Sequence, residues 1–284
     1  MEAHINQKIN QPASFRLIAT DIDGTLANSA GELTPYTIRV LRALSARGLT
    51  VALVTGLNPW PARRYLEQLG ADIRAISLNG IFLLEDGKVH ESEFLAQELV
   101  RQVAEMAVEA GYVPQVYGAD LVVRYLPAPA GNALMQRLVA ERPFQPYVAV
   151  ESLDALLAVR PAQIAFHETE PRARRLYERL LAEVGDHAYV VFQPGARSWV
   201  EVNHAEARKD VALLALARRL DVAPEEIIYF GDNLNDLSVF KAVPHCVAMG
   251  NARPEIQALA WQETGTNDED GVARLLSRLF ALEG

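Results

Sequence analysis

The sequence has a single cysteine, Cys246, and no apolar run of membrane-spanning length, although 50% of its 284 residues are hydrophobic. One cysteine excludes an internal disulfide and suits a reducing compartment. A transmembrane helix needs about 20 consecutive apolar residues, so we expect no membrane-spanning segment. Residues 1–14 are polar and lack the apolar stretch of an export signal, and we expect a flexible arm there. The sequence therefore predicts a cytoplasmic protein.

Positive charge is also scarce, because 27 lysines and arginines stand against 36 aspartates and glutamates, which gives a formal net charge of −9. Nucleic acids and anionic membranes both require a positive face, so we expect neither as a partner. Lysine is the rarer cation and occurs only as Lys8, Lys88, Lys209 and Lys241. In a chain that otherwise uses arginine, a lysine is a mild sign that a compact point charge is needed there. The net charge still permits a local positive pocket.

Strands and helices alternate from residue 15 to residue 83. Short runs that are apolar on both faces predict strands at 16–20, 50–54 and 73–78, and amphipathic segments predict helices at 35–47 and 62–69. Thr34 and Pro35 form a strong helix start, and Gly48 is a helix stop. Buried strands separated by amphipathic helices are typical of a parallel sheet with helices on both faces.

The pattern changes after Asn79 and Gly80. A predicted hairpin at 81–90 is followed by further helices and strands, and we interpret 84–191 as an inserted α+β domain. The alternation then resumes, with strands predicted at 199–202, 226–230 and 246–249 and helices at 208–220, 234–243, 254–259 and 271–282. We therefore expect an α/β fold with a doubly wound, mostly parallel, Rossmann-like core sheet formed by 15–83 and 192–284.

Two carboxylates, Asp21 and Asp23, follow the first predicted strand and precede a Gly-Thr turn. Side chains two residues apart share a side of the sheet only while the strand continues, and the turn can bring both carboxylates to the same opening at the end of the strand. Such a pair could hold a metal cation, or it could divide the roles of nucleophile and acid/base. An Asp-Gly pair is also an ordinary turn signal, so the pair alone leaves both interpretations open.

Polar residues also follow later core strands, at the edge where open α/β sheets bind ligands. Thr55 and Gly56 come directly after a predicted strand, and a hydroxyl beside a backbone N–H can hold a phosphate oxygen, although Thr-Gly is more often only a turn. Lys209 begins a predicted helix and could neutralise a phosphate. Arg208 competes with it for that role, and an exposed lysine without function is the ordinary alternative.

The segment from Gly231 to Asp236 brings another aspartate, Asp232, to a strand end and opens a helix with Asn235 and Asp236. Helix capping explains Asn235 and Asp236 without any further role. Asp232 is harder to explain in that way, because a second carboxylate that converges on Asp21 would be repelled unless a cation bridged the two.

Taken together, these segments resemble the haloacid dehalogenase-like hydrolase superfamily, specifically its Cof-type phosphatases with a type IIB cap. The resemblance extends from Arg16 to Leu282, and the order and spacing of the motifs are very specific. The nucleophile motif of the family is similar to 21–25, its second motif to 55–56, its third to Lys209 and its fourth to 231–236. Stretches typical of the subfamily are 79–80, 248–252 and 269–272.

The resemblance implies a magnesium-dependent phosphatase that acts on a small phosphorylated metabolite, such as a sugar phosphate, FMN or pyridoxal phosphate. In that role Asp21 attacks phosphorus to form an aspartyl-phosphate, and Asp23 protonates the leaving oxygen and then activates water. Mg²⁺ is implied at the Asp21 side chain, the Asp23 backbone carbonyl and Asp232. The other implied site residues are the phosphate-binding Thr55, Gly56, Lys209 and Asn235, with Asp236 behind the metal or orienting Lys209.

Two positions depart from the pattern of the family. Leu57 stands where an arginine usually follows the second motif, and Asp210 stands where a glycine commonly follows the motif lysine. Neither change removes a catalytic group. We expect them to affect substrate preference and phosphate affinity rather than the type of reaction.

Two other functions stay open. A phosphomutase or other phosphotransferase on the same core must clamp a second phosphate, and the excess of acidic over basic residues in 85–190 counts against it. A non-catalytic protein that binds a phosphorylated ligand would be indicated by loss of Asp21, Asp23 or Asp232, and all three are present.

Overall fold

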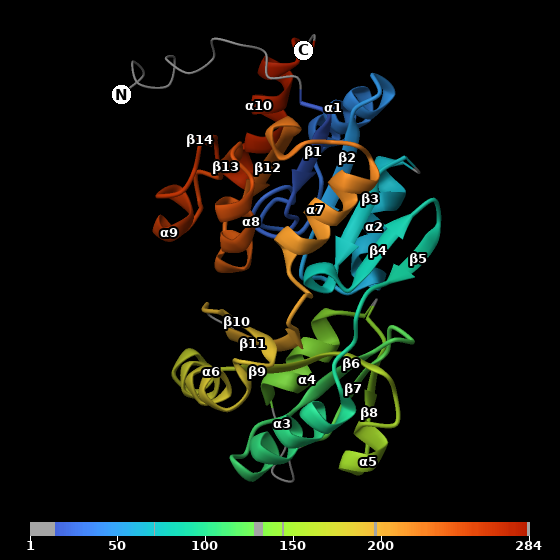
Figure 1. Cartoon of the computed structure of the whole chain (residues 1–284), viewed down its shortest axis with the longest axis vertical. Coiled ribbons are helices and arrows are strands. Elements are labelled where there is room, and N and C mark those ends of the chain that lie inside the picture. Colours follow the sequence, from blue (N-terminus) through green and yellow to red (C-terminus); the bar gives the residue numbers. More distant parts are fainter. Residues whose placement is uncertain (1–14, 71, 128–132, 144, 196–197, 283–284) are drawn as a thin grey trace.

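The computed structural model describes residues 15–70, 72–127, 133–143, 145–195 and 198–282, so the arm predicted at 1–14 lies outside the described residues. The chain forms two sheets, each with its own helices, which lie at opposite ends of the long axis of the molecule (Figure 1). We call the eight-stranded sheet with its helices the core and the six-stranded sheet with its helices the cap. Among the described residues, every helix is too short or too polar to cross a membrane.

The core sheet has the strand order β14-β13-β12-β1-β2-β3-β4-β5. Neighbours from β14 to β3 are parallel, and β4 pairs antiparallel with both β3 and β5. The strands are β1 (Leu17–Thr20), β2 (Thr50–Val54), β3 (Arg74–Ser77), β4 (Phe82–Glu85), β5 (Lys88–Glu91), β12 (Ile227–Gly231), β13 (Cys246–Ala248) and β14 (Gln262–Glu263). Every residue of β1 and β12 is buried, as expected for parallel strands covered on both faces.

Helices cover both faces of the core sheet because the chain leaves its centre in two directions. From β1 it moves to β2 and β3, whereas from β12 it moves the opposite way to β13 and β14. Such crossovers are right-handed, so the helices of the two halves lie on opposite faces. In Figure 1 the orange helix α7 lies in front of the sheet. The core helices are α1 (Pro35–Ala46), α2 (Pro59–Leu69), α7 (Lys209–Arg219), α8 (Leu237–Ala242), α9 (Pro254–Gln257) and α10 (Gly271–Leu279), with single 3₁₀ turns η2 (Leu78–Gly80), η3 (Pro224–Glu226), η4 (Leu234–Asp236) and η5 (Asn267–Glu269).

Local signals place the helix ends as predicted. The Thr34 hydroxyl accepts a hydrogen bond from the backbone N–H of Thr37 at 3.0 Å, and Pro35 is the first residue of α1. Gly48 follows the end of α1 with a φ of +86°, a conformation that glycine adopts without strain. The predicted start and stop of this helix are therefore confirmed.

The cap sheet has the order β10-β11-β9-β6-β7-β8, and its pairs are antiparallel except for β7 with β8. Helices α3 and α6 pack on β9 and bury an apolar cluster of their own. The cap strands are β6 (Gln115–Gly118), β7 (Val123–Tyr125), β8 (Tyr147–Ala149), β9 (Pro161–Glu168), β10 (Ala188–Gln193) and β11 (Ser198–His204). The cap helices are α3 (Gln97–Glu109), α4 (Ala133–Glu141), α5 (Leu153–Leu156) and α6 (Glu170–Val184).

Two segments join a different sheet from the one predicted. The hairpin β4–β5, which begins near the expected start of the insertion at 84, extends the core sheet through β3. The strand predicted at 199–202 to reopen the core lies in β11, which pairs with β9 and β10 of the cap. The core sheet therefore includes residues beyond 84, and the cap sheet includes residues beyond 191. The reason is physical, because an apolar pattern identifies a strand but not the partner with which it forms hydrogen bonds.

The loops that follow β1 and β12 meet at the centre of the core sheet. These strands are neighbours at the point where the strand order reverses. Ligands of open α/β sheets bind outside the carboxyl ends of the strands at such a point. This position brings together the residues after Thr20 and those after Gly231.

Candidate functional site

Asp21 and Asp23 lie at the carboxyl end of β1. The backbone N–H of Asp21 still donates to the carbonyl oxygen of Phe230 at 2.9 Å, and the chain turns immediately afterwards. Gly24 in this turn has a φ of +76°, and a Cβ at this position would lie 2.5 Å from Oδ2 of Asp232. Only glycine therefore permits both the turn and the close approach of the loop that follows β12.

The ammonium of Lys209 lies between two carboxylates. Its Nζ is 3.0 Å from Oδ1 of Asp21 and 2.7 Å from Oδ1 of Asp236, and its side chain has no exposed surface. Burial disfavours the charged ammonium, but the two carboxylates outweigh it and raise the pKa of Lys209 above its ordinary value. Burial raises the pKa of Asp21, and Lys209 opposes that rise. The lysine therefore supplies the positive charge that a buried carboxylate at position 21 requires.

Asp236 is fully occupied by protein donors. Its Oδ1 accepts hydrogen bonds from Lys209 and, at 2.6 Å, from the hydroxyl of Tyr229. Its Oδ2 accepts from the backbone N–H groups of Asp232 and Asn233 at 2.9 and 3.1 Å. A carboxylate with four such donors has little capacity for a further ligand, so Asp236 is suited to orienting Lys209 and the loop after β12.

Asp232 is less completely satisfied. Its Oδ1 accepts a hydrogen bond from the Thr25 hydroxyl at 2.8 Å. Burial and the neighbouring Asp236 raise the pKa of Asp232 to about 7, because both disfavour its ionised form. A divalent cation beside it would reverse this preference.

The carboxylates offer a set of hard oxygen ligands. One oxygen from each of Asp21, Asp232 and Asp236 lies within 4.8 Å of the others. Within the described part of the chain, Oδ2 of Asp21 and Oδ2 of Asp232 accept no side-chain or backbone hydrogen bond. Carboxylate oxygens are the ligands that Mg²⁺ prefers, so the residues present fit this ion. Asp21 and Asp232 each keep a carboxylate oxygen that accepts no hydrogen bond, so they are favoured as its ligands. Asp236 already accepts four hydrogen bonds and would not contact the ion directly.

The Asp23 side chain is separate from this carboxylate cluster and faces the cleft. The side chain is accessible to solvent, but it lies in a cleft whose walls replace much of the surrounding water. This desolvation raises the pKa of Asp23, and the charges of Arg142, Lys209 and Arg64 oppose the rise. A carboxyl group with a raised pKa beside a carboxylate is suited to carrying a proton.

Thr55, Gly56 and Asn235 line the same cleft as Asp21 and Asp23. The Thr55 hydroxyl oxygen accepts a hydrogen bond from the backbone N–H of Leu57 at 3.0 Å, which leaves the hydroxyl hydrogen to donate. The Oδ1 atom of Asn235 is buried without a hydrogen-bond partner among the described residues. The structure therefore gathers every predicted site residue at one edge of the core sheet.

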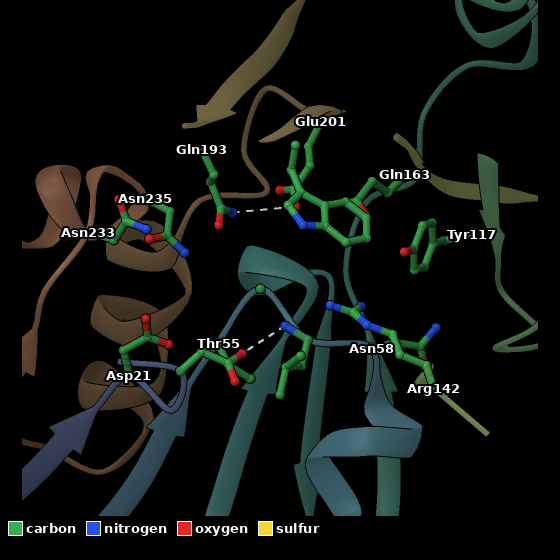
Figure 2. Close-up of a pocket in the computed structure, with 14 residues that line it drawn as sticks. Asp21, Thr55, Asn58, Tyr117, Arg142, Gln163, Gln193, Glu201, Asn233 and Asn235 are labelled. Carbon is green, nitrogen blue, oxygen red and sulfur yellow. Dashed lines mark hydrogen bonds between the residues drawn. The ribbon is translucent and has the colours of Figure 1, made fainter. Parts of the chain in front are cut away.

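The cap supplies the opposite wall of the cleft, through residues that the sequence analysis did not single out. Figure 2 shows Glu201 and Gln193 on the far side of the cleft from Asp21 and Thr55. The cap residues that line it are Tyr117, Arg142, Gln163, Gln193, Trp199 and Glu201. One signal was available in the sequence, because Glu201 is a charged residue between two valines, Val200 and Val202, which are both buried in β11. Arg124, on cap strand β7, is not among the residues that line the cleft and pairs with Asp120 at 2.7 Å.

No arginine follows Thr55 and Gly56, and the nearest arginines along the chain do not line the cleft. Arg63 stacks on Trp60, and Arg64 donates to the carbonyl oxygen of Gly31 at 3.3 Å. Among the described lining residues of the cleft, Arg142 of the cap is the only arginine or lysine. It lies beside Trp199, with its guanidinium carbon 4.8 Å from the ring centre. The positive charge opposite Asp21 therefore comes from the cap.

Comparisons with known proteins agree with this geometry. A model of the haloacid dehalogenase-like hydrolase family matches residues 18–276. Phosphatase YwpJ of Bacillus subtilis is 28% identical, over 94% of this chain and 100% of the relative. The 5-amino-6-(5-phospho-D-ribitylamino)uracil phosphatase YitU of the same organism is 28% identical, over 94% of this chain and 98% of the relative. The solved structure of a haloacid dehalogenase-like hydrolase from Bacillus subtilis has a TM-score of 0.81 at 24% identity, covering 93% of this chain and 100% of that chain.

The family match spans the core and the cap, from β1 to α10. The solved structure shares the fold, and both relatives named above are phosphatases. The resemblance stated from the sequence motifs is thereby confirmed. The chain belongs to the haloacid dehalogenase-like hydrolase family and is a phosphoric monoester hydrolase.

Proposed function

We propose that this phosphatase depends on Mg²⁺ and hydrolyses a small phosphorylated metabolite, of the sugar phosphate, FMN or pyridoxal phosphate type, through an aspartyl-phosphate on Asp21. The observation that carries the proposal is the contact of Lys209 with Oδ1 of Asp21 at 3.0 Å, while Oδ2 accepts no hydrogen bond from the described residues. This arrangement keeps an anionic nucleophile inside a buried site.

Two displacements at phosphorus complete the proposed reaction. An Asp21 oxygen forms a bond to phosphorus while the bond to the leaving oxygen breaks, and the Asp23 carboxyl group gives its proton to that oxygen. A water molecule then attacks the phosphorus of the aspartyl-phosphate while the bond from phosphorus to the Asp21 oxygen breaks, and the Asp23 carboxylate takes a proton from the water. Free phosphate leaves, and both aspartates return to their starting forms. The raised pKa of Asp23 supports its part as the acid.

Mg²⁺ would be held by the side chains of Asp21 and Asp232 and by the backbone carbonyl of Asp23. When bound, the ion would neutralise charge between the anionic nucleophile and the anionic phosphate. Thr55, the Gly56 backbone, Lys209 and Asn235 would bind the phosphoryl oxygens. Asp236 would hold Lys209 in place, because the hydrogen bonds that its carboxylate accepts from four donors fix its position.

The size of the substrate follows from the cap, which closes the cleft opposite Asp21 and leaves room for a small leaving group. A relative named for a phosphorylated ribitylamino-uracil supports a small metabolite. Phosphoryl transfer to a second phosphorylated substrate is disfavoured, because Arg142 is the only arginine or lysine among the described residues that line the cleft. We also propose a cytoplasmic location, which the buried, unpaired thiol of Cys246 supports.

A phosphate-release screen over a panel of phosphorylated metabolites tests the proposal, with Mg²⁺ present and with the ion removed by a chelator. We expect release of free phosphate from at least one small phosphomonoester, and we expect the chelator to abolish it. Isomerisation of hexose phosphates without phosphate release would instead indicate a phosphomutase. Binding without turnover across the panel would indicate a non-catalytic protein.

A further inference from the structure

Glu201 is a buried carboxyl group in the cleft for which the proposed reaction has no use. It projects from β11 of the cap, is 6% exposed and lines the cleft opposite Asp21 (Figure 2). Its Oε2 accepts a hydrogen bond from Nδ2 of Asn79 at 2.9 Å, across the boundary between cap and core. The side chain is therefore fixed in position at the wall of the cleft.

The second oxygen of Glu201 is poorly satisfied. Within the described part of the chain, its only donor is Nε2 of Gln193 at 3.5 Å, beyond the usual range for such a bond. A buried carboxylate with one good hydrogen bond is unfavourable unless a further donor reaches it. Because Glu201 lines the cleft opposite Asp21, this oxygen is the one left to bond to a group that enters the cleft.

The neighbouring side chains extend this polar wall. Nε2 of Gln163 donates to Oδ1 of Asn203 at 2.8 Å, which leaves its carbonyl oxygen as an acceptor toward the cleft. Trp199, two residues before Glu201 on the same strand, adds a flat apolar surface to the same wall. Acceptor oxygens beside an aromatic ring suit a leaving group that carries hydroxyl or amino donors.

We propose that Glu201 determines substrate specificity by accepting a hydrogen bond from a hydroxyl or amino group of the leaving group. The enzyme then discriminates against phosphomonoesters whose leaving group lacks such donors, because these would leave Oε1 of Glu201 without a good hydrogen-bond donor. This inference rests on the proposed phosphatase function, which it extends by a class of substrate.

The test compares kcat/KM at pH 8, above the pKa of about 7 to which burial raises Glu201, for a panel of polyol phosphates and for alkyl phosphates of equal carbon number. Acetyl phosphate, which has a minimal leaving group, reports on the phosphoryl chemistry alone. The key variant is Glu201→Gln, whose amide oxygen can still accept from Asn79 while its NH₂ group replaces the free acceptor. Glu178→Gln makes the same chemical change on the exposed surface of α6 and is the matched control.

We expect the wild type to prefer its best polyol phosphate over the matched alkyl phosphate by about 10- to 100-fold, the worth of a hydrogen bond to a charged group. Glu201→Gln should lose most of that preference and keep its turnover of acetyl phosphate, and Glu178→Gln should behave as the wild type. An equal loss on all three substrates, or a wild type without preference, would overturn the inference while leaving the phosphatase proposal intact. Failure of the wild type to hydrolyse even acetyl phosphate would overturn both. The preference of the wild type is informative even if the variant folds poorly.

Discussion

The buried ammonium of Lys209 lies 3.0 Å from Oδ1 of Asp21, which brings together two core segments that the cap separates in the sequence. The same ammonium contacts Asp236, and removing it would leave two buried carboxylates without a positive partner. Loss of one member of a buried ion pair usually costs about 3–5 kcal/mol. This relationship makes Lys209 important both for the fold and for the reaction.

Lys209→Met should therefore lower both stability and activity. We expect a loss of about 3 kcal/mol in the free energy of unfolding, measured by urea denaturation, because two carboxylates become unpaired. We also expect kcat/KM to fall by about 100-fold or more, because an uncompensated Asp21 is a poor anionic nucleophile. Lys241→Met removes an exposed lysine from α8 and should change neither quantity. Full activity in Lys209→Met would contradict the assigned role.

Gly24 offers a test of the metal site that separates steric displacement from backbone strain. In Gly24→Ala, the new Cβ would lie 2.5 Å from Oδ2 of Asp232 and must push that carboxylate aside. Gly87→Ala has the same left-handed strain, with a φ of +72°, but no atom within 4 Å of the new Cβ. Both should lose about 1 kcal/mol of stability. Only Gly24→Ala should raise the Mg²⁺ concentration for half-maximal activity, by about 10-fold or more.

An unchanged Mg²⁺ requirement in Gly24→Ala would contradict the assignment of Asp232 as a ligand. An equal rise in both variants would show that strain, rather than displacement of the carboxylate, is the cause. Titration of phosphate release with Mg²⁺ distinguishes these results.

Asp23→Asn should affect substrates according to the quality of their leaving group. An amide cannot donate the proton that an alkoxide leaving group needs, and general acid catalysis is commonly worth about 10²- to 10⁴-fold. We expect kcat for an alkyl phosphate to fall by that amount in single-turnover experiments. Formation of the phosphoryl-enzyme from p-nitrophenyl phosphate should fall much less, because nitrophenolate leaves without a proton. Equal losses on both substrates would argue against Asp23 as the acid.

The raised pKa of Glu201 predicts that the free energy of unfolding depends on pH. Burial raises its pKa from 4.5 to about 7, against the hydrogen bond from Asn79 and the charges of Lys209 and Arg142. The folded protein therefore binds this proton more tightly than the unfolded chain, and the resulting stabilisation is lost as the pH rises through about 7. Between pH 5 and pH 8 the wild type should lose up to about 3 kcal/mol relative to Glu201→Gln, which stays neutral. Urea denaturation of both proteins at the two pH values measures this difference, and a constant difference would contradict it.

The core could be predicted from sequence because local patterns of apolar and polar residues specify its strands and helices. Apolar strands at 17–20, 50–54 and 227–231 lie within a residue of their expected positions, and each is followed by a polar loop at the same edge of the sheet. Once the strands are recognised as parallel, the convergence of Asp21, Thr55 and Asp232 follows from topology.

The cap could not be assembled in the same way. Whether β11 joins the core or the cap depends on hydrogen bonds to β9 and β10, and nothing in its own residues specifies these partners. The cleft residues Arg142 and Glu201 face the site only because of that pairing and of how the cap lies over the core. Their contributions to the site therefore became visible only in three dimensions.

The central claim is that Asp21 becomes phosphorylated, and chemical trapping tests it most directly. Enzyme quenched during turnover of its best substrate is treated with borohydride, which reduces an aspartyl-phosphate to homoserine, and the peptide that contains residues 21 and 23 is sequenced by mass spectrometry. We predict homoserine at position 21 and unmodified aspartate at position 23. Enzyme quenched without substrate should contain homoserine at neither position. Homoserine at another position would contradict the mechanism. So would unmodified Asp21 in enzyme that is quenched during steady turnover of a substrate from which the phosphoryl-enzyme accumulates.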